Sequence, residues 1–167
     1  MKKKKALVVG GTGQIGLYLS KFLLGKKYKV FITTRKLTKQ TNKKLVFLKI
    51  KKRVNFVNLR LFSYDEIKKL LIKIKPDEIY YLAGQSSVEK SFQKKYETIK
   101  TNVIYCENFL KVIRFNSLNT KFFNAASSEI FGNHKKRVNL YSKKIPVSPY
   151  GKAKLKSFNL VRKYRNQ

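Results

Sequence analysis

The chain has 167 residues, of which 43% are hydrophobic and 13% aromatic, a composition that supports a folded core and excludes a disordered chain. Lysine and arginine number 40 against 8 acidic residues, which gives a formal net charge of +32. One cysteine, Cys106, and one histidine, His134, exclude an internal disulfide framework and argue against a metal site. At this length we expect one domain, residues 1–167.

Strand-like and helix-like segments alternate along the chain. Short apolar runs predict strands at Ala6–Val9, Lys29–Thr33, Leu45–Leu48, Asn55–Asn58, Glu78–Leu82 and Lys121–Asn124. Apolar residues at helical spacing predict helices at Gln14–Leu24, Asp65–Ile74, Tyr96–Phe115 and Tyr150–Tyr164, the second of them ended by Pro76. This alternation indicates an α/β fold, a doubly wound parallel sheet with helices on both faces.

The amino-terminal segment resembles the start of a secretory signal, because the basic run ending at Lys5 precedes apolar Ala6–Val9. Only four apolar residues stand before Gly10, whereas a secretory signal needs about 7–15. No apolar run approaches the ~18 residues of a membrane span. We therefore expect a cytoplasmic protein without a membrane partner.

A glycine-rich loop follows the first predicted strand and opens the first predicted helix. It consists of Gly10, Gly11, Thr12, Gly13, Gln14, Ile15 and Gly16. The spacing of its first, fourth and seventh residues is a variant of the dinucleotide-binding fingerprint, in which glycines allow a tight turn and bring a pyrophosphate to a helix N-terminus. Between a strand and a helix this motif predicts dinucleotide binding, and the alternative is a glycine turn that serves packing alone.

The residues after the second predicted strand bear on the choice of cofactor. An acidic residue there would bind the ribose 2′-hydroxyl of NAD, but this chain has Thr33, Thr34, Arg35 and Lys36. Because an arginine pairs with a 2′-phosphate, Arg35 favours NADP. The alternative is that a lysine-rich chain carries a base at this position by chance.

Two further clusters carry acid–base chemistry. Ser127, Ser128 and Glu129 follow the strand Lys121–Asn124, at the carboxyl edge of the sheet where sites of doubly wound folds lie. Tyr150 and Lys154 are four residues apart and share a helix face. An ammonium beside a phenol lowers the phenol pKa and makes it an acid–base group for a hydroxyl/ketone redox step. The alternatives are a helix-capping serine cluster and a chance pair in a chain rich in both residue types.

The positive charge allows two interpretations. Phosphate neutralisation by basic residues drives nucleic-acid binding. However, most of the excess is lysine, which is weaker than arginine in bidentate recognition, and it is scattered along the whole chain with short runs at Lys2–Lys5, Lys51–Arg53 and Lys135–Arg137. Since the chain is also rich in Asn, Ile, Phe and Tyr, we favour compositional bias and expect no specific nucleic-acid partner.

Four segments together resemble the extended short-chain dehydrogenase/reductases, and among them the GDP-mannose 4,6-dehydratase family. These segments are the glycine loop, Pro76–Val88 with Ser91-Phe92 beyond it, Phe123–Gly132, and Ser148-Pro149-Tyr150 with Lys154. The resemblance covers nearly the whole chain. It implies a Rossmann fold and an NADP-dependent lyase that converts GDP-mannose to GDP-4-keto-6-deoxymannose.

The resemblance also implies residue roles. Tyr150 would deprotonate the sugar C4 hydroxyl, and Lys154 would support Tyr150 and hold the nicotinamide ribose. Ser127 would hydrogen-bond the C4 oxygen, and Glu129 would take the C5 proton and assist loss of the C6 hydroxyl as water. Cofactor contacts would come from the glycine loop, Arg35, Tyr150 and Lys154 and from Leu82, Ala83, Gly84, Gln85 and Ser86.

The chain departs from the family pattern at several positions. Arg60 stands where the family has an adenine-contacting Asp, Glu97 stands where it has a tyrosine, and Tyr105-Cys106 replaces a Gly-Thr pair. The family is also much longer than this chain. We therefore expect the fold to stop after its fifth main strand and the Tyr150 helix, without a substrate domain and with strand Lys121–Asn124 left as an uncovered edge.

Three hypotheses follow. The first is the cofactor half of a nucleotide-sugar dehydratase, completed by a separate carboxyl-terminal half or a homo-oligomer. An epimerase or decarboxylase of the same superfamily competes with it, although Glu129 argues against a simple epimerase. The second is a non-catalytic NADP-binding module. The third is a basic nucleic-acid-binding protein on the same scaffold.

Overall fold

The computed structural model describes residues 2–34, 37–59 and 62–166. The chain divides into two compact units. The first comprises Met1–Ala83 and Lys111–Phe123, and the second comprises Gly84–Leu110 and Asn124–Gln167. Each unit is described by itself.

A five-stranded sheet forms the centre of the first unit. Its strands are β1 (Lys5–Val9), β2 (Lys29–Thr34), β3 (Asn55–Asn58), β4 (Glu78–Tyr81) and β5 (Lys121–Asn124), in the order β3-β2-β1-β4-β5. β1 pairs in parallel with β2 and β4, and β2 pairs in parallel with β3. The predicted doubly wound parallel sheet is confirmed, and β5 lies at one edge of it as expected.

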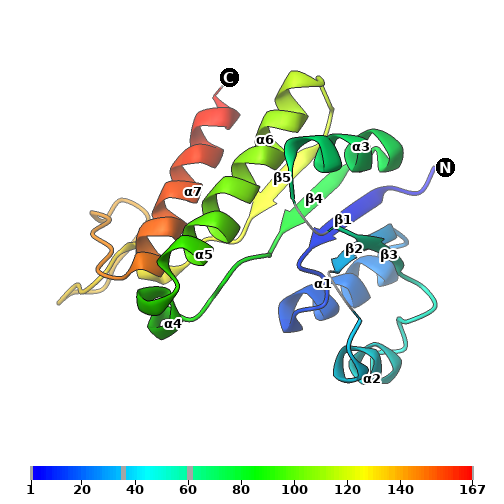
Figure 1. Cartoon of the computed structure of the whole chain (residues 1–167), viewed down its shortest axis with the longest axis horizontal. Coiled ribbons are helices and arrows are strands. Elements are labelled where there is room, and N and C mark those ends of the chain that lie inside the picture. Colours follow the sequence, from blue (N-terminus) through cyan, green and yellow to red (C-terminus); the bar gives the residue numbers. More distant parts are fainter. Residues whose placement is uncertain (1, 35–36, 60–61, 167) are drawn as a thin grey trace. The chain divides into compact units, whose positions relative to one another are not determined.

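Three helices cover this sheet. α1 (Gln14–Gly25) and α2 (Lys39–Phe47) lie on one side of it and α3 (Tyr64–Ile74) on the other (Figure 1). Alternate strand positions explain the arrangement, because successive side chains point to opposite faces. Ala6 and Val8 join one buried cluster with Leu17 and Leu45 of the first two helices. Leu7 and Val9 point the other way and are also fully buried.

The prediction of a strand at Leu45–Leu48 is wrong, because these residues end helix α2. Thr38 caps the amino end of this helix, where its hydroxyl accepts a hydrogen bond from the Thr41 N–H at 3.1 Å. Leu45 and Leu48 are buried, whereas Phe47 between them is 81% exposed. That three-residue spacing of buried positions is helical, and a short apolar run does not distinguish it from a strand.

Three helices end in Schellman motifs that lack the usual glycine. Lys27, Lys49 and Ser117 follow α1, α2 and α6 (Tyr105–Phe115), and each has a positive φ between 47° and 63°. In α2 the Lys49 N–H donates to the Val46 carbonyl and the Ile50 N–H to the Leu45 carbonyl. The hydrogen bonds of the motif are therefore made, but a side chain occupies the left-handed position that glycine adopts without strain.

The second unit is mainly helical. It contains α4 (Val88–Gln93), α5 (Lys95–Ile99), a π-helical segment η1 (Lys100–Ile104), the first part of α6, a short 3-10 turn η2 (Ser128–Ile130) and α7 (Pro149–Arg165). α7 contacts α4, α5, η1 and η2. Among the described residues, no helix is long and apolar enough to cross a membrane.

The π-helical segment interrupts the long helix predicted at Tyr96–Phe115. Side chains compete with the regular backbone pattern there. The Thr101 hydroxyl donates to the Glu97 carbonyl at 2.8 Å, and the Asn102 amide donates to the Thr98 carbonyl at 3.0 Å. This local widening places Thr101 and Asn102 beside the loop that follows Gly84.

The helix ends yield a prediction about stability. Lys49→Gly is expected to raise the free energy of unfolding by about 0.5–1 kcal/mol, because it removes a side chain from a left-handed backbone position. The matched control Lys43→Gly, an exposed position inside α2, is expected to lower it by about 1 kcal/mol. Urea unfolding monitored by circular dichroism measures both changes. A loss of stability in both variants would show that the Lys49 conformation carries no strain.

Candidate functional site

The glycine loop connects β1 to α1 in the first unit, and three of its glycines, Gly10, Gly11 and Gly16, have no room for a side chain. Gly10 has φ +83°, and a Cβ on it would lie 2.8 Å from the Ala83 nitrogen. A Cβ on Gly16 would lie 2.7 Å from the Gly10 carbonyl oxygen. The start of α1 therefore packs directly on the loop, and the loop packs on the chain that leaves β4.

Hydrogen bonds fix the loop at the end of β1. The Gly10 N–H donates to the Thr33 hydroxyl of β2 at 3.0 Å, and the Gly13 N–H donates to the Gly10 carbonyl at 3.1 Å. Gly13 is the N-cap of α1, which has no side-chain cap and no acidic residue in its first turn. Thr12 is half-buried. The amino end of α1 therefore has backbone N–H groups without a capping side chain, and a pyrophosphate at this position stays a prediction.

The predicted cofactor segment after β4 is divided between the units. Leu82 and Ala83 belong to the first, where the Leu82 N–H donates to the Val9 carbonyl at 2.9 Å. Gly84, Gln85 and Ser86 belong to the second.

Thr101 and Asn102 of the π-helical segment hold this part of the second unit. The Gln85 N–H donates to the Thr101 hydroxyl at 3.1 Å, and the Asn102 amide donates to the Gln85 carbonyl at 3.0 Å. The Asn102 Oδ1 atom is buried without a hydrogen-bond partner and lies against Gly84, where a side chain would clash with it. The sequence did not single out Asn102, because the predicted helix Tyr96–Phe115 also contains Asn108 and nothing local distinguishes the two asparagines.

Tyr150 and Lys154 lie on successive turns of α7, as their spacing predicts. Both are buried, and the Lys154 Nζ is 5.8 Å from the centre of the Tyr150 ring. The same Nζ donates to the Ala125 carbonyl at 3.0 Å. Burial lowers the pKa of Lys154 below its ordinary value. The lysine head therefore lies in a partly dry environment beside the phenol and the end of the 121–124 strand.

Two backbone contacts orient Tyr150. Its N–H donates to the Ser91 hydroxyl at 3.1 Å, and Ser148 caps α7 by accepting from the Gly151 N–H at 3.0 Å. Ser91 is fully buried. It was noted in the sequence only as part of a resembling segment, and its contact with the chain 59 residues later could not be derived from local pattern.

The serine–glutamate turn lies against the first turn of α7. Ser127 is the N-cap of η2, and its hydroxyl accepts from the Glu129 N–H at 3.3 Å. A Cβ on Gly151 would lie 2.5 Å from the Glu129 carbonyl oxygen, so the two segments touch through the backbone. Ser127 and Glu129 are half-buried. The second unit thus brings Ser127, Glu129, Tyr150 and Lys154 into one neighbourhood.

Four other residues of interest are Arg35, Arg60, Tyr96 and Cys106. Arg35 and Arg60 lie outside the described residues. Tyr96 is 71% exposed on α5. Burial raises the pKa of Cys106 to about 12, which keeps this thiol protonated and unreactive. Within the described part of the chain, no three His, Cys, Asp or Glu side chains gather into a metal-binding group.

Comparison with known proteins gives a consistent set of similarities. A family model for GDP-mannose 4,6 dehydratase matches residues 7–167. The GDP-mannose 4,6-dehydratase of Vibrio cholerae serotype O1 is 34% identical over 99% of this chain and 46% of its own length. The chain therefore spans about half the length of the curated relatives it matches.

Solved structures show the same fold. A UDP-Glc/GlcNAc 4-epimerase from Campylobacter jejuni superimposes with a TM-score of 0.87 at 23% identity, over 98% of this chain and 49% of its own. A UDP-glucuronic acid 4-epimerase from Bacillus cereus, in complex with UDP-glucuronic acid and NAD, gives a TM-score of 0.83 at 26% identity, over 98% of this chain and 52% of its own. In both comparisons the chain corresponds to about half of a longer structure.

The environment of Lys154 predicts a pH dependence of stability. Because burial lowers the folded-state pKa, the charged form of Lys154 costs stability below that pKa, and the cost fades as pH rises through it toward the unfolded value. Lys154→Met has no such cost. The stability of this variant relative to the parent chain is therefore expected to decrease from about pH 7 to pH 10.

Lys152→Met is the control, since the Lys152 side chain is exposed on the same helix turn. Denaturant unfolding at a series of pH values measures both differences. A constant difference for Lys154→Met, or an equal pH trend in the control, would contradict the buried-charge explanation.

Proposed function

The chain belongs to the GDP-mannose 4,6-dehydratase family, and from this premise we propose that it is the cofactor-binding and proton-transfer half of a nucleotide-sugar dehydratase. The observation that carries the proposal is the neighbourhood in the second unit. A buried phenol and a buried ammonium share one face of α7 there, and a serine–glutamate turn packs against the first turn of the same helix. This is an acid–base set suited to oxidising a hydroxyl and eliminating water.

The residues of the first unit fit a dinucleotide. The glycine loop packs closely on its surroundings, because a Cβ at Gly10 or Gly16 would clash with neighbouring backbone atoms. An uncapped helix N-terminus without acidic residues favours a pyrophosphate at that surface. The Bacillus cereus epimerase named above holds NAD, which supports a nicotinamide dinucleotide here. The preference for NADP over NAD rests on Arg35 in the sequence. The expected cytoplasmic location rests on the short apolar stretch Ala6–Val9, which is too short for a secretory signal.

Within this proposal each side chain of the second unit has one task. Tyr150 takes the proton of the sugar C4 hydroxyl, and the Lys154 ammonium stabilises the charge on the phenol oxygen. Ser127 donates a hydrogen bond to the C4 oxygen. A nicotinamide dinucleotide held by the glycine loop would supply reversible hydride transfer, which this oxidation at C4 and the later reduction at C6 require.

Glu129 carries the elimination. Oxidation at C4 acidifies the C5 proton, which the Glu129 carboxylate takes, and the protonated group then assists departure of the C6 hydroxyl as water. The proton lost at C5 and the hydroxyl lost at C6 balance as one water molecule. GDP-mannose is the proposed substrate from the family, and the substrate-selecting residues belong to the part of the relatives that this chain does not span.

An epimerase is the second candidate, because solved structures with this fold act as UDP-sugar 4-epimerases by name. An epimerase would invert C4 and release no water. Analysis of the sugar product separates the two reactions, since a dehydratase yields a 4-keto-6-deoxy sugar. Glu129 favours the dehydratase.

A titration of this chain tests the cofactor site. NADPH is expected to bind saturably, more tightly than NADH, and to remain bound at high salt. Gly16→Ala is expected to weaken NADPH by at least about tenfold, because backbone atoms of Gly10 and Gly11 occupy the space of its methyl group. The control Gly25→Ala, in the same helix with nothing within 4 Å of its Cβ, is expected to bind normally.

Fluorescence of the reduced nicotinamide measures these affinities. Binding that disappears with salt, or an equal effect of both alanine variants, would reject the glycine loop as a dinucleotide site. It would leave a chain that carries the family motifs without a working cofactor site.

Tyr150→Phe tests the chemistry separately. In the protein that includes the substrate-binding half, it is expected to lower turnover of GDP-mannose by at least about 100-fold, because the ring remains and the proton acceptor is lost. NADPH affinity is expected to stay within about twofold of the parent value, since a hydroxyl alone is removed. Full turnover by the variant would exclude Tyr150 as the base, and a matching loss of NADPH binding would indicate a structural role.

A further inference from the structure

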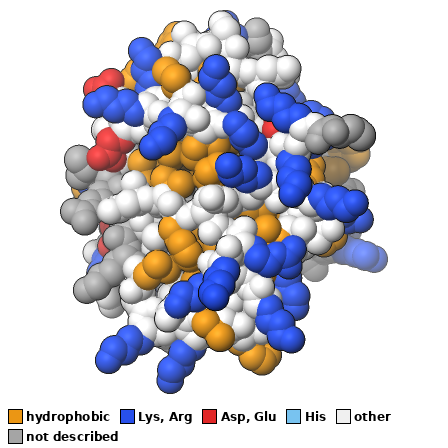
Figure 2. Space-filling view, turned by 90° about the vertical axis from the view of Figure 1, so that its right-hand side faces the viewer, with side chains coloured by type: hydrophobic (Ala, Val, Ile, Leu, Met, Phe, Trp, Pro, Cys, Tyr) orange, Lys and Arg blue, Asp and Glu red, His pale blue; other side chains and the backbone are white. Residues whose placement is uncertain are grey.

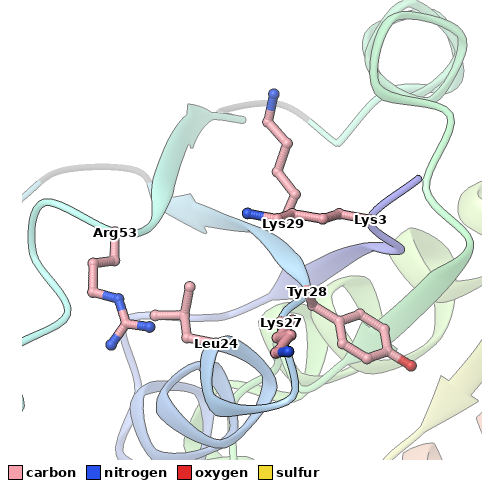
Figure 3. Close-up of a pocket in the computed structure, with 6 residues that line it drawn as sticks. All are labelled: Lys3, Leu24, Lys27, Tyr28, Lys29 and Arg53. Carbon is pink, nitrogen blue, oxygen red and sulfur yellow. The ribbon is translucent and has the colours of Figure 1, made fainter. Parts of the chain in front are cut away.

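A pocket lies in the first unit at the amino ends of the strands, away from the glycine loop. It has a volume of about 570 Å³ and is lined by Lys3, Leu24, Lys27, Tyr28, Lys29 and Arg53 (Figure 3). Lys3 precedes β1, Lys27 and Tyr28 connect α1 to β2, and Arg53 precedes β3. Since these strands are parallel, their amino ends meet at one edge of the sheet, and cations from distant parts of the sequence converge there.

These cations have no acidic partners in the lining of the pocket. Two acidic residues, Asp77 and Glu78, lie at the start of β4, and both already accept hydrogen bonds. Asp77 accepts from the Lys5 N–H at 2.7 Å, and Glu78 accepts from the hydroxyls of two tyrosines.

Three of the four cations are available to a ligand. The Lys29 Nζ lies over the Phe31 ring, 5.6 Å from its centre, which gives it a partner on its own strand. Lys3, Lys27 and Arg53 are exposed and carry flexible ammonium groups and one guanidinium fork. An arginine fork with two neighbouring ammonium groups suits an anion with several oxygens on adjacent centres.

The floor of the pocket is apolar. Leu24 is 8% exposed, and the Tyr28 ring is half-buried beside it. The Tyr28 hydroxyl donates to Glu78 at 3.0 Å, and this hydrogen bond raises the pKa of Tyr28, so the ring bears no negative charge. A ligand would therefore meet cations around the rim and a neutral surface below.

We propose that this pocket binds the oligophosphate group of a small molecule, with Arg53, Lys3 and Lys27 as its donors. The volume lies within the roughly 300–1,000 Å³ of small-molecule sites. A nucleic acid would require an extended basic stripe. On the face in Figure 2, lysine and arginine side chains are instead spread among apolar and neutral patches.

The pocket is separate from the proposed dinucleotide site. The two lie at opposite ends of β1, which is five residues long, so about 17 Å of strand divides them. Binding at the pocket is therefore expected to persist when NADPH is present in excess, which removes the glycine loop as a competing phosphate site.

Calorimetric titration of the chain with tripolyphosphate and with GTP, in excess NADPH and at fixed ionic strength, tests the proposal. The double variant Lys27→Gln/Arg53→Gln is expected to bind tripolyphosphate at least about tenfold more weakly than the parent chain, because it removes two charged donors. The matched control is Lys26→Gln/Lys52→Gln, which removes the same charge from neighbouring exposed positions outside the pocket lining. Its affinity is expected to stay within about twofold of the parent.

The titrations also identify the source of the phosphate. Tighter binding of GTP than of tripolyphosphate would indicate a nucleotide that contacts Tyr28 and Leu24, and equal binding would indicate a free oligophosphate. Equal weakening in both double variants, loss of tripolyphosphate binding when NADPH is added, or tighter and unselective binding of a single-stranded oligonucleotide would overturn the proposal. Thermal unfolding of each variant confirms that a lost affinity is not a lost fold.

Discussion

Close approach of backbone segments at glycine is the constraint on which both parts of the candidate site depend. The glycine loop reaches the chain after β4 because Gly10 has no Cβ, and α1 reaches the loop because Gly16 has none. In the second unit, Gly151 admits the Glu129 carbonyl to the first turn of α7. Each of these contacts joins main chain to main chain, where no side chain can move aside to relieve a clash.

The same chain places lysine where glycine would be less strained. Lys27 and Lys49 occupy the left-handed positions that follow α1 and α2. The cost there is about 1–2 kcal/mol per residue, and it leaves the hydrogen bonds of the helix end intact. Of the 8 glycines in the sequence, Gly25 alone has no atom near its missing Cβ. Glycine is thus kept at the crowded positions Gly10, Gly16 and Gly151, whereas lysine replaces it at Lys27 and Lys49, where only backbone strain favours glycine.

The sequence predicted the sheet and the helices that position the site, and its errors have local physical causes. The spacing of apolar residues and the position of the glycine loop were sufficient to predict β1, α1 and β2, because these two signals agree with each other. They failed at Leu45–Leu48, where a buried helix turn and a short strand share the same apolar run. The π-helical segment could not be predicted, since it depends on Asn102 and Thr101 bonding to their own backbone and to a loop far along the chain.

For the site residues, too, local spacing could be predicted and long-range contacts could not. The i, i+4 spacing of Tyr150 and Lys154 gave a shared helix face before any tertiary information was needed. The spacing could not indicate the hydrogen bonds that hold this pair, because their partners Ser91 and Ala125 are distant in the sequence. Burial of Lys154 could not be derived either, since it depends on how the helices of the second unit pack.

The supporting contacts of the second unit also say where its chemistry is determined. Ser91, Ala125 and the Glu129 carbonyl all belong to the same unit as Tyr150 and Lys154. The Ser91 hydroxyl accepts a hydrogen bond from the Tyr150 N–H, and the Ala125 carbonyl accepts one from the Lys154 Nζ. The Glu129 carbonyl lies against Gly151. The relative placement of Tyr150, Lys154 and the serine–glutamate turn is therefore a local property of this unit.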